Sequence, residues 1–426
     1  MHRAFLERLF HTAVAAAHPS QCLPPHLPAP PASGRIVMLA AGKAAGSMVE
    51  VAERHYLDDI GVPARRITGL AVTRRGYARP TKLIRVVEAG HPVPDAAGLG
   101  ATLETLALAD IAGADDLVLV LISGGASANW IAPATDLSLA EKQALTRSLL
   151  ACGASITEIN TVRKHLSRIK GGRLAARAQP ARLLTIAISD VPGDDPAVIG
   201  SGPTVPDPST LADARAIVAR YSLSVPGTVT RALADPANES PKPGDPLFGN
   251  TAYVFAARPA DVFQSVEAAV RAAGYECMLL GTALEGEARD VAAEHARIAL
   301  DLKAQGRRAV ILSGGELTVT VRGKGRGGPN QEYALALALA LGGEPGIAGL
   351  AADTDGTDGG VGSPDDPAGA YVDNATLQRA RELGLDPAAY LGDNNSTEFF
   401  ASVGNLLRPG ATHTNVNDFR AIMVDS

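Results

Sequence analysis

The sequence predicts two α/β domains, and three observations carry this prediction. Short, nearly continuous apolar runs alternate with glycine turns and helical segments through both halves of the chain. Such alternation is typical of parallel strands that helices cover on both faces. Glycine and proline together make up about 17% of the residues, against a usual share of about 12%, which indicates many tight turns and glycine-rich loops. At 426 residues the chain is long enough for two or three domains.

The composition argues against several classes of function. The formal net charge is −6 and aromatic residues are only 4%, so the chain lacks the basic, stacking surface that nucleic acids or anionic membranes need. Cys22, Cys152 and Cys277 are far apart and form no CxxC pair, which excludes a disulfide framework and a zinc ribbon. No apolar run is long enough to span a membrane. We therefore expect a cytoplasmic protein, and a homo-oligomer remains open.

The first half predicts a doubly wound parallel sheet. Residues 1–17 form an amphipathic helix in which Glu7 and Arg8 exclude a signal peptide, and the proline-rich segment 22–34 is a loop. Helices are expected over 46–57 and 137–153. Strands, each followed by a turn, are expected within 35–43, 67–73, 83–95, 116–127 and 183–195.

The second half predicts a smaller mixed α/β domain. Prolines and polar residues in 234–250 indicate a linker, so we place one domain over 1–240 and the other over 241–426. The run YALALALALG (333–342) alternates like a strand, but its length and its alanine and leucine content favour a helix. Strands of this domain are expected over 251–257, 276–281, 308–315, 317–323 and 349–353. The active site is expected in a cleft between the two domains.

Two glycine turns in the first domain follow predicted strands. Gly42, Lys43 and Gly46 begin a helix, where backbone N–H groups attract an anion and the lysine suits a phosphate. This is no Walker A loop, and a solvated lysine at a helix start is the alternative. The turn 123–127 (SGGAS) lets backbone amides approach a ligand at the carboxyl end of a strand, or is a simple tight turn.

Acidic and basic segments follow further along the first domain. Asp190 and Asp194 come after a strand, where carboxylates can hold Mg²⁺ or accept a hydroxyl proton, and Ser201 adds a hydroxyl. A basic helix is expected over 160–173, and it cannot present all its cations on one face, so we expect some to be solvated and others to point at a phosphate or carboxylate. His165 is more easily explained as a packed histidine than as a catalyst.

The second domain contains a glycine-rich segment and an acidic loop. Residues 323–328 match G-x-G-x-x-G between an expected strand and a helix, but the acid that should follow is badly placed. Lys324 and Arg326 within it favour phosphate binding, since arginine grips phosphate oxygens with two N–H groups. The loop 353–359 (DTDGTDG) suits a metal or a hydroxyl ligand better than an EF-hand. Basic groups on glycine turns and acids at strand ends are the equipment of phosphoryl transfer.

These motifs, in this order, resemble the glycerate 2-kinase family whose C-terminal half is called the MOFRL domain. The resemblance covers nearly the whole chain, and members have often been labelled hydroxypyruvate reductase. It rests on AAGKAAGSM, EAGHPVPD, LISGGASA, INTVRKHLSRIKGGRLA, ISDVPGDDPAVIGSGPTVPDP, LSGGELTVTVRGKGRGGPNQEYALALA, DTDGTDG and THTNVND. In the last motif His413 replaces a small residue, which puts ligand contacts near Thr412 and Thr414 in doubt.

The resemblance implies an ATP- and Mg²⁺-dependent kinase that phosphorylates the C2 hydroxyl of D-glycerate, with a Rossmann-like N-terminal domain. It implies that Lys43 and Arg326 act at the transferred phosphate and that Asp190 is the base or a magnesium ligand, with Asp194 as a second metal ligand. Residues expected to bind ATP are Gly42, Gly46, Ser123, Gly124, Gly125, Ser127, Ser201, Gly325 and Asn330. Residues expected to bind the acceptor are Lys43, Glu316, Arg326, Asp353 and Asp355.

Two other functions remain as alternatives. A nicotinamide-dependent hydroxypyruvate reductase is supported by the glycine pattern of 323–328 and by the label of the family. A sugar-acid binding protein without catalysis would require loss of the basic pair, and Lys43 and Arg326 are both present. We therefore predict a glycerate 2-kinase.

Overall fold

The computed structural model describes residues 2–360, 363 and 365–425, and these form two compact units. Unit I is Cys22–Ala256, and unit II is the rest of the described chain, up to Gln21 and from Ala257 onward. The units thus change at 21/22 and at 256/257, whereas the sequence places one boundary at 240/241.

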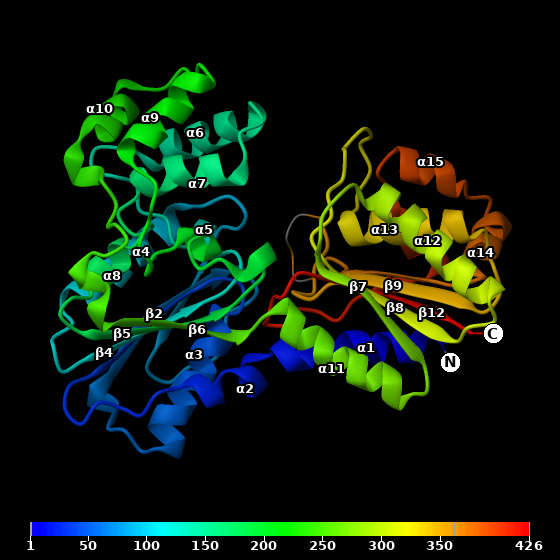
Figure 1. The fold of residues 1–426 in the computed structure, drawn as a ribbon, viewed down its shortest axis with the longest axis horizontal. Coiled ribbons are helices and arrows are strands. Elements are labelled where there is room, and N and C mark those ends of the chain that lie inside the picture. Colours follow the sequence, from blue (N-terminus) through cyan, green and yellow to red (C-terminus); the bar gives the residue numbers. More distant parts are fainter. Residues whose placement is uncertain (1, 361–362, 364, 426) are drawn as a thin grey trace. The chain divides into compact units, whose positions relative to one another are not determined.

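Unit I is built on a six-stranded sheet in the order β3-β2-β1-β4-β5-β6 (Figure 1). Its strands are β1 (Ile36–Ala41), β2 (Ile67–Arg74), β3 (Arg85–Ala89), β4 (Leu117–Ile122), β5 (Arg182–Ile188) and β6 (Thr251–Ala257). β1 pairs in parallel with both β2 and β4, so that Ile36 lies between Ile67 and Leu117. The order of strands reverses here, and ligands of open α/β sheets bind at the carboxyl ends of such strands. The predicted doubly wound domain is confirmed.

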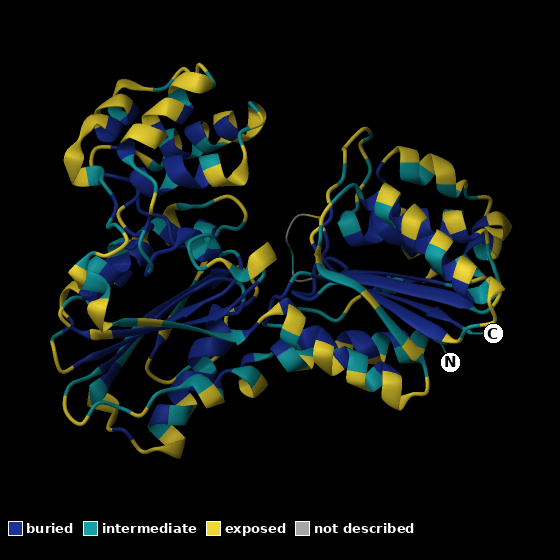
Figure 2. Ribbon diagram, viewed as in Figure 1, coloured by how far each residue is buried: buried dark blue, intermediate teal, exposed yellow. Residues whose placement is uncertain are grey.

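The burial of the strands explains their composition. β1 and β4 are buried along their whole length, as expected for strands with helices on both faces, and Figure 2 shows this sheet largely dark. The helices that flank the sheet are α3 (Ala45–Arg54), α4 (Ala96–Asp110), α5 (Ala126–Asn129) and α8 (Arg173–Arg177). The turns before α3 and α5 are the two glycine turns that the sequence analysis singled out.

Four further helices of unit I pack around a core of their own. They are α6 (Leu139–Ala151), α7 (Ile156–His165), α9 (Leu211–Arg220) and α10 (Gly227–Ala234), grouped to one side of the sheet in Figure 1. α6 and α7 each start with a capping box, formed by Ser138 with Glu141 and by Ser155 with Glu158. The shared core includes Leu145, Leu149, Ile159, Val162, Leu166, Ile217 and Leu233.

Unit II is a mixed sheet in the order β11-β10-β9-β12-β8-β7. Its strands are β7 (Glu276–Leu284), β8 (Ala309–Gly315), β9 (Ile347–Asp353), β10 (Gly369–Val372), β11 (Leu406–Leu407) and β12 (Asp418–Val424). β7 and β8 are parallel, whereas β12 runs antiparallel to both β8 and β9. The predicted mixed α/β architecture of the C-terminal half is confirmed.

Helices cover both faces of the unit II sheet. One face carries α1 (His2–Ala17) and α11 (Pro259–Ala272), and the other carries α12 (Ala288–Ala304) and α13 (Pro329–Leu341) (Figure 1). α14 (Thr376–Glu382), α15 (Pro387–Gly392) and α16 (Ser396–Val403) complete the unit, and the short α2 (Pro19–Cys22) follows α1. The N-terminal helix belongs here because Phe10 packs edge-on against Phe419 of β12, with ring centroids 6.1 Å apart.

The alanine and leucine run forms a helix, as predicted. α13 is buried on almost every side between the sheet and helices α12, α15 and α16. A helix enclosed in this way needs no polar face, which is why its sequence shows no helical period.

Two strand assignments need correction, and three strands were not predicted. Segment 251–257, expected in the second domain, is β6 at the edge of the unit I sheet. Segment 317–323 is not a strand, and its only bridge pairs Thr318 with Glu287 in the described chain. The strands that were not predicted are β10, β11 and β12, although β12 lies at the centre of its sheet. No helix in the described ranges has the length and apolar character that a membrane span requires.

Candidate active site

The turn after β1 is fastened to the turn after β4. Gly42 has a φ of +119°, and a Cβ there would lie 2.4 Å from the Ser123 Oγ, so only glycine fits. The backbone N–H of Lys43 donates to the Gly124 carbonyl at 2.8 Å, and that of Ala44 donates to the Ser123 Oγ at 2.9 Å. The structure therefore brings four of the predicted residues together at the carboxyl ends of two neighbouring strands.

The stem of Lys43 borders the second glycine of the SGGAS turn. A Cβ at Gly125 would lie 3.3 Å from the Lys43 Cγ and 3.0 Å from the His91 Nε2. His91 was not singled out from the sequence, although it lies within EAGHPVPD. Gly46 has a different explanation, because a Cβ there would lie 2.7 Å from the Tyr77 carbonyl oxygen, so helix packing alone requires this glycine.

Ser127 and Ser201 meet although they are far apart in sequence. Their Oγ atoms are 2.9 Å apart, and Ser201 also lies within 3.4 Å of the Asn160 Oδ1. Ser201 has a φ of +63° and stands between two glycines, Gly200 and Gly202, that are also left-handed. Such a backbone costs a serine free energy, and strain of this kind is concentrated at functional sites.

The turn after β5 holds the two predicted metal ligands. Asp190 lies two residues beyond the end of the strand, and Asp194 has a left-handed backbone with a φ of +52°. In the described chain the Asp194 Oδ1 is buried without a hydrogen-bond partner. Among the residues that the structure describes, no group of three or more His, Cys, Asp or Glu side chains is arranged to hold a metal. These residues fit Mg²⁺, since this ion often takes one or two carboxylates and completes its shell with phosphate oxygens and water.

A buried basic cluster lies beside the two serines, and the sequence analysis gave its members no role. The expectation of one helix over 160–173 is wrong, because α7 ends at His165 and α8 begins only at Arg173, after the left-handed Gly171 and Gly172. Lys170 is 0% exposed, and its Nζ donates to the Ser127 carbonyl at 2.8 Å and to the Gly200 carbonyl at 3.5 Å. Arg163 on α7 donates to the same Ser127 carbonyl at 3.5 Å. Burial, and then the positive charges of Arg163 and Lys142, lower the pKa of Lys170 well below its usual value. Across the described residues none of these three cations forms an ion pair with a carboxylate.

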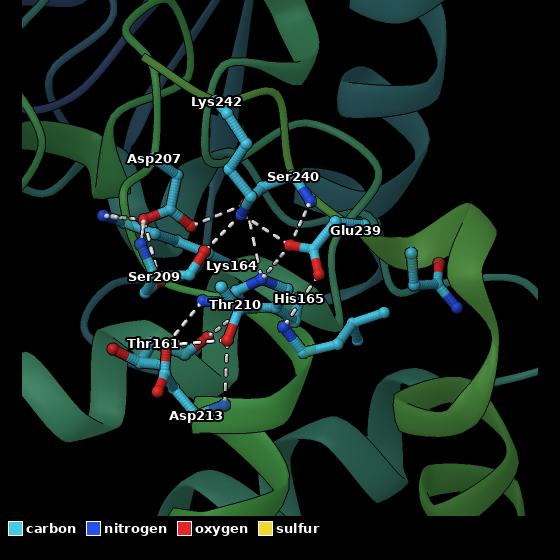
Figure 3. A network of polar contacts seen from close by, with 12 residues as sticks. Thr161, Lys164, His165, Asp207, Ser209, Thr210, Asp213, Glu239, Ser240 and Lys242 are labelled. Carbon is cyan, nitrogen blue, oxygen red and sulfur yellow. Dashed lines mark hydrogen bonds and ion pairs between the residues drawn. The ribbon is translucent and has the colours of Figure 1, made fainter.

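The opposite side of α7 is anchored by a polar network (Figure 3). The Lys164 Nζ lies 3.4 Å from the Asp207 Oδ1, and the Ser240 hydroxyl donates to the Asp207 Oδ2 at 3.0 Å. His165 contacts the Thr161 carbonyl at 2.9 Å through Nδ1 and the Glu239 Oε1 at 3.0 Å through Nε2. The histidine is therefore packed and structural, which agrees with the simpler interpretation of the sequence.

Glu239 stays ionised within this network. Burial raises its pKa, but hydrogen bonds from Lys242, from the Leu211 backbone N–H and from His165 outweigh that effect and lower the pKa of Glu239 to about 2. Residues 239–242 belong to the segment that the sequence treats as a linker. In the structure this segment fixes α7 and α9.

The glycine-rich segment of unit II is explained by packing. A Cβ at Gly323 or at Gly325 would lie 2.3 Å from atoms of the segment 393–395, and one at Gly327 would lie 2.2 Å from the Ser396 Oγ. The predicted contact between Gly325 and a nucleotide has no independent support here. The expected strand before this segment is absent from the described chain, so the strand–turn–helix context of a dinucleotide site is missing.

Arg326 projects from this segment with its backbone fixed and its side chain exposed. Its N–H donates to the Asn395 Oδ1 at 3.1 Å, and its carbonyl accepts from the Thr397 N–H at 2.9 Å. The guanidinium is 59% exposed and lies 3.9 Å from Asp366 and 3.8 Å from Glu398, beyond hydrogen-bond distance. The side chain can therefore reach a ligand without breaking a strong contact.

The acidic loop after β9 uses much of its charge to shape itself. The Asp353 Oδ1 accepts from the Asp355 N–H at 2.8 Å, and the Asp355 Oδ1 accepts from both the N–H and the hydroxyl of Thr357. Asn330 is buried between two further acids, with its Nδ2 3.2 Å from the Asp358 Oδ1 and 2.7 Å from the Asp418 Oδ1. Burial raises the pKa of Asp358 to about 7. Packing thus accounts for these contacts without any ligand.

The turn around His413 is also structural. His413 has a left-handed φ of +58°, a conformation that is uncommon for residues other than glycine. Thr412 donates to the Thr354 carbonyl, and Thr414 donates to the Ala17 carbonyl at 2.7 Å. Both hydroxyls therefore have partners within unit II.

The predicted site residues fall into two groups. Unit I holds Gly42, Lys43, Gly46, Ser123, Gly124, Gly125, Ser127, Asp190, Asp194 and Ser201, and unit II holds Glu316, Gly325, Arg326, Asn330, Asp353 and Asp355. Within unit I the turns after β1 and β4 are in contact, and Ser127 joins Ser201. Glu316 is exposed directly after β8. The role of each residue stays a prediction.

Comparison with known proteins extends over both units. Residues 5–234 match a family model described as a domain of unknown function (DUF4147), and residues 309–418 match the MOFRL family. A putative hydroxypyruvate reductase from Agrobacterium vitis is 46% identical over 99% of this chain and 94% of its own length. D-glycerate 2-kinase from Thermotoga maritima is 38% identical over 90% of this chain and 89% of its own length.

The fold is shared with a solved structure. A crystal structure of glycerate kinase from Thermotoga maritima covers 99% of this chain and is itself covered to 99%, with a TM-score of 0.86 and 36% identity. The similarity therefore includes both sheets and the helices that surround them.

Proposed function

The chain belongs to the glycerate kinase family that has a C-terminal MOFRL domain, and on this basis we propose that it transfers the γ-phosphoryl group of ATP to the C2 hydroxyl of D-glycerate. The full-length similarity to D-glycerate 2-kinase carries the proposal. The locked pair of turns that presents Lys43 supports it, because a cation held at a strand end suits a transferred phosphate.

The kinase is favoured over the reductase although two relatives from Agrobacterium vitis bear the reductase name. The reductase interpretation depended on the glycine pattern of 323–328, and those glycines are accounted for by close packing against 393–396 and, at Gly328, against Asp358. The segment also lacks the preceding strand that a dinucleotide fingerprint requires. The sequence feature that suggested a nicotinamide cofactor therefore gives it no support.

The residues of unit I have proposed roles at the phosphates. Lys43 stabilises the transferred phosphoryl group, while Asp190 accepts the hydroxyl proton or holds the metal. Asp194 is the better metal ligand, because its Oδ1 is buried without a partner in the described chain. Mg²⁺, bound with the nucleotide, would neutralise charge on the phosphate oxygens. ATP is expected along the turns 42–46 and 123–127, with Ser201 beside them.

The residues of unit II would complete the reaction. Arg326 is exposed and can grip a phosphate or carboxylate with two N–H groups. Glu316, Asp353 and Asp355 are proposed to contact the hydroxyl groups of the acceptor. We further propose a cytoplasmic location, since no disulfide joins the three cysteines within the described residues and a reducing compartment suits thiols.

One experiment tests the proposal directly. The purified protein is incubated with D-glycerate, ATP and MgCl₂, and the products are identified by ³¹P NMR. We expect ADP and 2-phosphoglycerate in equal amounts, with no product when the metal is chelated. Formation of 3-phosphoglycerate would correct the position of transfer. Rapid NADH oxidation with hydroxypyruvate, without ADP formation from D-glycerate, would overturn the kinase in favour of the reductase.

A further inference from the structure

We propose that Arg163 and Lys170, with the hydroxyls of Ser127 and Ser201, form an oxyanion-binding subsite of unit I. This inference rests on the proposed function, in which each reactant carries an oxyanion: a carboxylate on the acceptor and phosphates on the nucleotide. The sequence analysis left the targets of the basic segment 160–173 open. In the structure, Arg163 and Lys170 are the cations of this segment that lie beside Ser127.

The first argument is the missing counter-charge. A buried amine without an anion nearby is costly to charge, so its pKa falls unless a ligand supplies the opposite charge. Lys170 is fully buried, and its two contacts within the described chain are with neutral carbonyls. Lys164, on the same helix as Arg163, is paired with the carboxylate of Asp207. Within its described residues, unit I thus places a carboxylate beside Lys164 but none beside Arg163 or Lys170.

The second argument is unused hydrogen-bonding capacity. A guanidinium has five N–H donors, and that of Arg163 makes one long hydrogen bond of 3.5 Å among the described residues. Its planar fork matches the geometry of a carboxylate or phosphate. Ser127 and Arg163 are both partly exposed, whereas Ser201 and Lys170 are buried beneath them. A small anion can therefore reach Ser127 and Arg163 from solvent, and the Ser201 Oγ lies 2.9 Å from that of Ser127.

The third argument is pre-organisation. α7 is held from its other side by the contacts of Lys164 and His165 shown in Figure 3, so the helix that carries Arg163 is fixed before a ligand arrives. Ser201 reaches Ser127 only through three successive left-handed residues. Strain and rigid support together are typical of a binding site rather than of simple packing.

The subsite also adjoins the proposed phosphate site. Ser127 ends the same SGGAS turn whose Gly124 carbonyl accepts from the Lys43 N–H. Lys43 thus contacts the SGGAS turn near its start, through the Gly124 carbonyl. Arg163 and Lys170 contact the end of this turn, through the Ser127 carbonyl. One reactant anion at each end would explain why both ends are basic.

The test compares Arg163→Gln with Arg168→Gln. Arg168 is exposed and only five residues away, so its variant controls for the loss of one positive charge. At constant ionic strength we expect Arg163→Gln to raise the KM of one reactant at least tenfold, Arg163→Lys to have a smaller effect, and Arg168→Gln to stay within twofold of the wild type. If only the KM for D-glycerate rises, the subsite binds the carboxylate. If only the KM for ATP rises, the subsite binds a phosphate.

A binding measurement separates this inference from the proposed function. Calorimetric titration with inorganic phosphate and with D-glycerate needs no turnover, and Arg163→Gln should weaken the binding of at least one of them at least tenfold. Ser201→Ala should weaken the binding of the same ligand, because the substitution removes the hydroxyl that is proposed to contact it. A wild type that binds these anions but transfers no phosphoryl group would overturn the kinase and keep the subsite. Unchanged KM values and unchanged affinities in Arg163→Gln would overturn the subsite.

Discussion

The backbone N–H of Ala44 donates to the Ser123 Oγ at 2.9 Å, and this bond ties the turn that presents Lys43 to the carboxyl end of β4. Ser123 is 0% exposed, so the bond is shielded from water. A neighbouring bond joins the Lys43 N–H to the Gly124 carbonyl. The main chain of Lys43 is therefore fixed independently of its side chain.

Because of this arrangement, Lys43→Ala should remove catalysis without disturbing the fold. A cation that acts mainly on charge developing in the transition state affects kcat, and we expect kcat to fall at least about 100-fold. Circular dichroism and the Tm should match those of the wild type. Turnover near the wild-type value in a folded Lys43→Ala protein would show that the proposed role is wrong.

Asp194→Asn should weaken the activation by Mg²⁺. Asparagine tolerates the left-handed backbone at this position, so the fold should survive, but the negative charge that would attract the metal is lost. We expect the Mg²⁺ concentration for half-maximal activity to rise at least about tenfold, with partial recovery at high Mg²⁺. Asp195→Asn is the matched control, because its side chain caps the Ala197 N–H and an amide oxygen can replace it. Identical Mg²⁺ titrations for Asp194→Asn and the wild type would contradict the assignment.

The stability of unit II should depend on pH through His295. Burial, and secondly the charge of Arg420, lower the pKa of His295 from 6.5 to about 4, while its Nδ1 contacts the Tyr333 hydroxyl at 2.8 Å. Between these two pH values the unfolded chain binds the proton more tightly, so stability is fully present above pH 6.5 and is lost as the pH falls toward 4. The shift corresponds to about 3 kcal/mol of unfolding free energy.

Denaturant unfolding at a series of pH values measures this effect. His295→Gln should flatten the dependence between pH 6.5 and 4, even if the variant is less stable throughout. His11→Gln serves as the control, since His11 is an exposed residue of α1. Parallel curves for His295→Gln and the wild type would mean that other groups cause the acid sensitivity.

Local patterns were enough to predict the sheet of unit I and its glycine turns. β1 and β4 are continuous apolar runs directly followed by Gly42 and Ser123. The strand, the turn and the candidate site residues are therefore adjacent in the sequence and can be predicted together. β12 was missed because its sequence DFRAIMV contains a buried Arg420 whose partners, Asp418, Ser313 and Gly314, lie mainly on another strand. β6 was given to the wrong domain because a strand's sequence does not say which sheet edge it joins.

The basic cluster shows the same limit within the candidate site. Arg163 and Lys170 meet Ser127 and Gly200 through folding, and nothing in the local sequence distinguishes these cations from the exposed Arg168. The glycines of 323–328 show the opposite error, because the sequence suggested a ligand site where the structure shows close packing. Close packing against another backbone and close approach of a phosphate both require glycine, and the sequence alone cannot separate the two causes.

Arg326→Lys tests whether Arg326 of unit II acts through its positive charge alone or also through the bidentate geometry of its guanidinium. The lysine keeps the charge but loses the bidentate geometry, so we expect kcat/KM to fall at least about tenfold. Arg322→Lys, the same change four residues earlier at another exposed position, should stay near the wild type. Unchanged kinetics of Arg326→Lys would show that charge alone is enough.

Combining Arg326→Ala with Lys43→Ala then asks whether the two units act on one group. The two residues belong to different units, and side chains without a shared partner change rates independently, so their effects multiply. If both stabilise the same transferred phosphoryl group, loss of either leaves the other with less to stabilise, and the double variant should be at least about tenfold more active than the product of the single effects predicts. The measurement is kcat/KM for D-glycerate in the four proteins of the cycle. Simple multiplication of the two effects would place Lys43 and Arg326 at separate tasks and would remove the argument that both units contribute to one reaction centre.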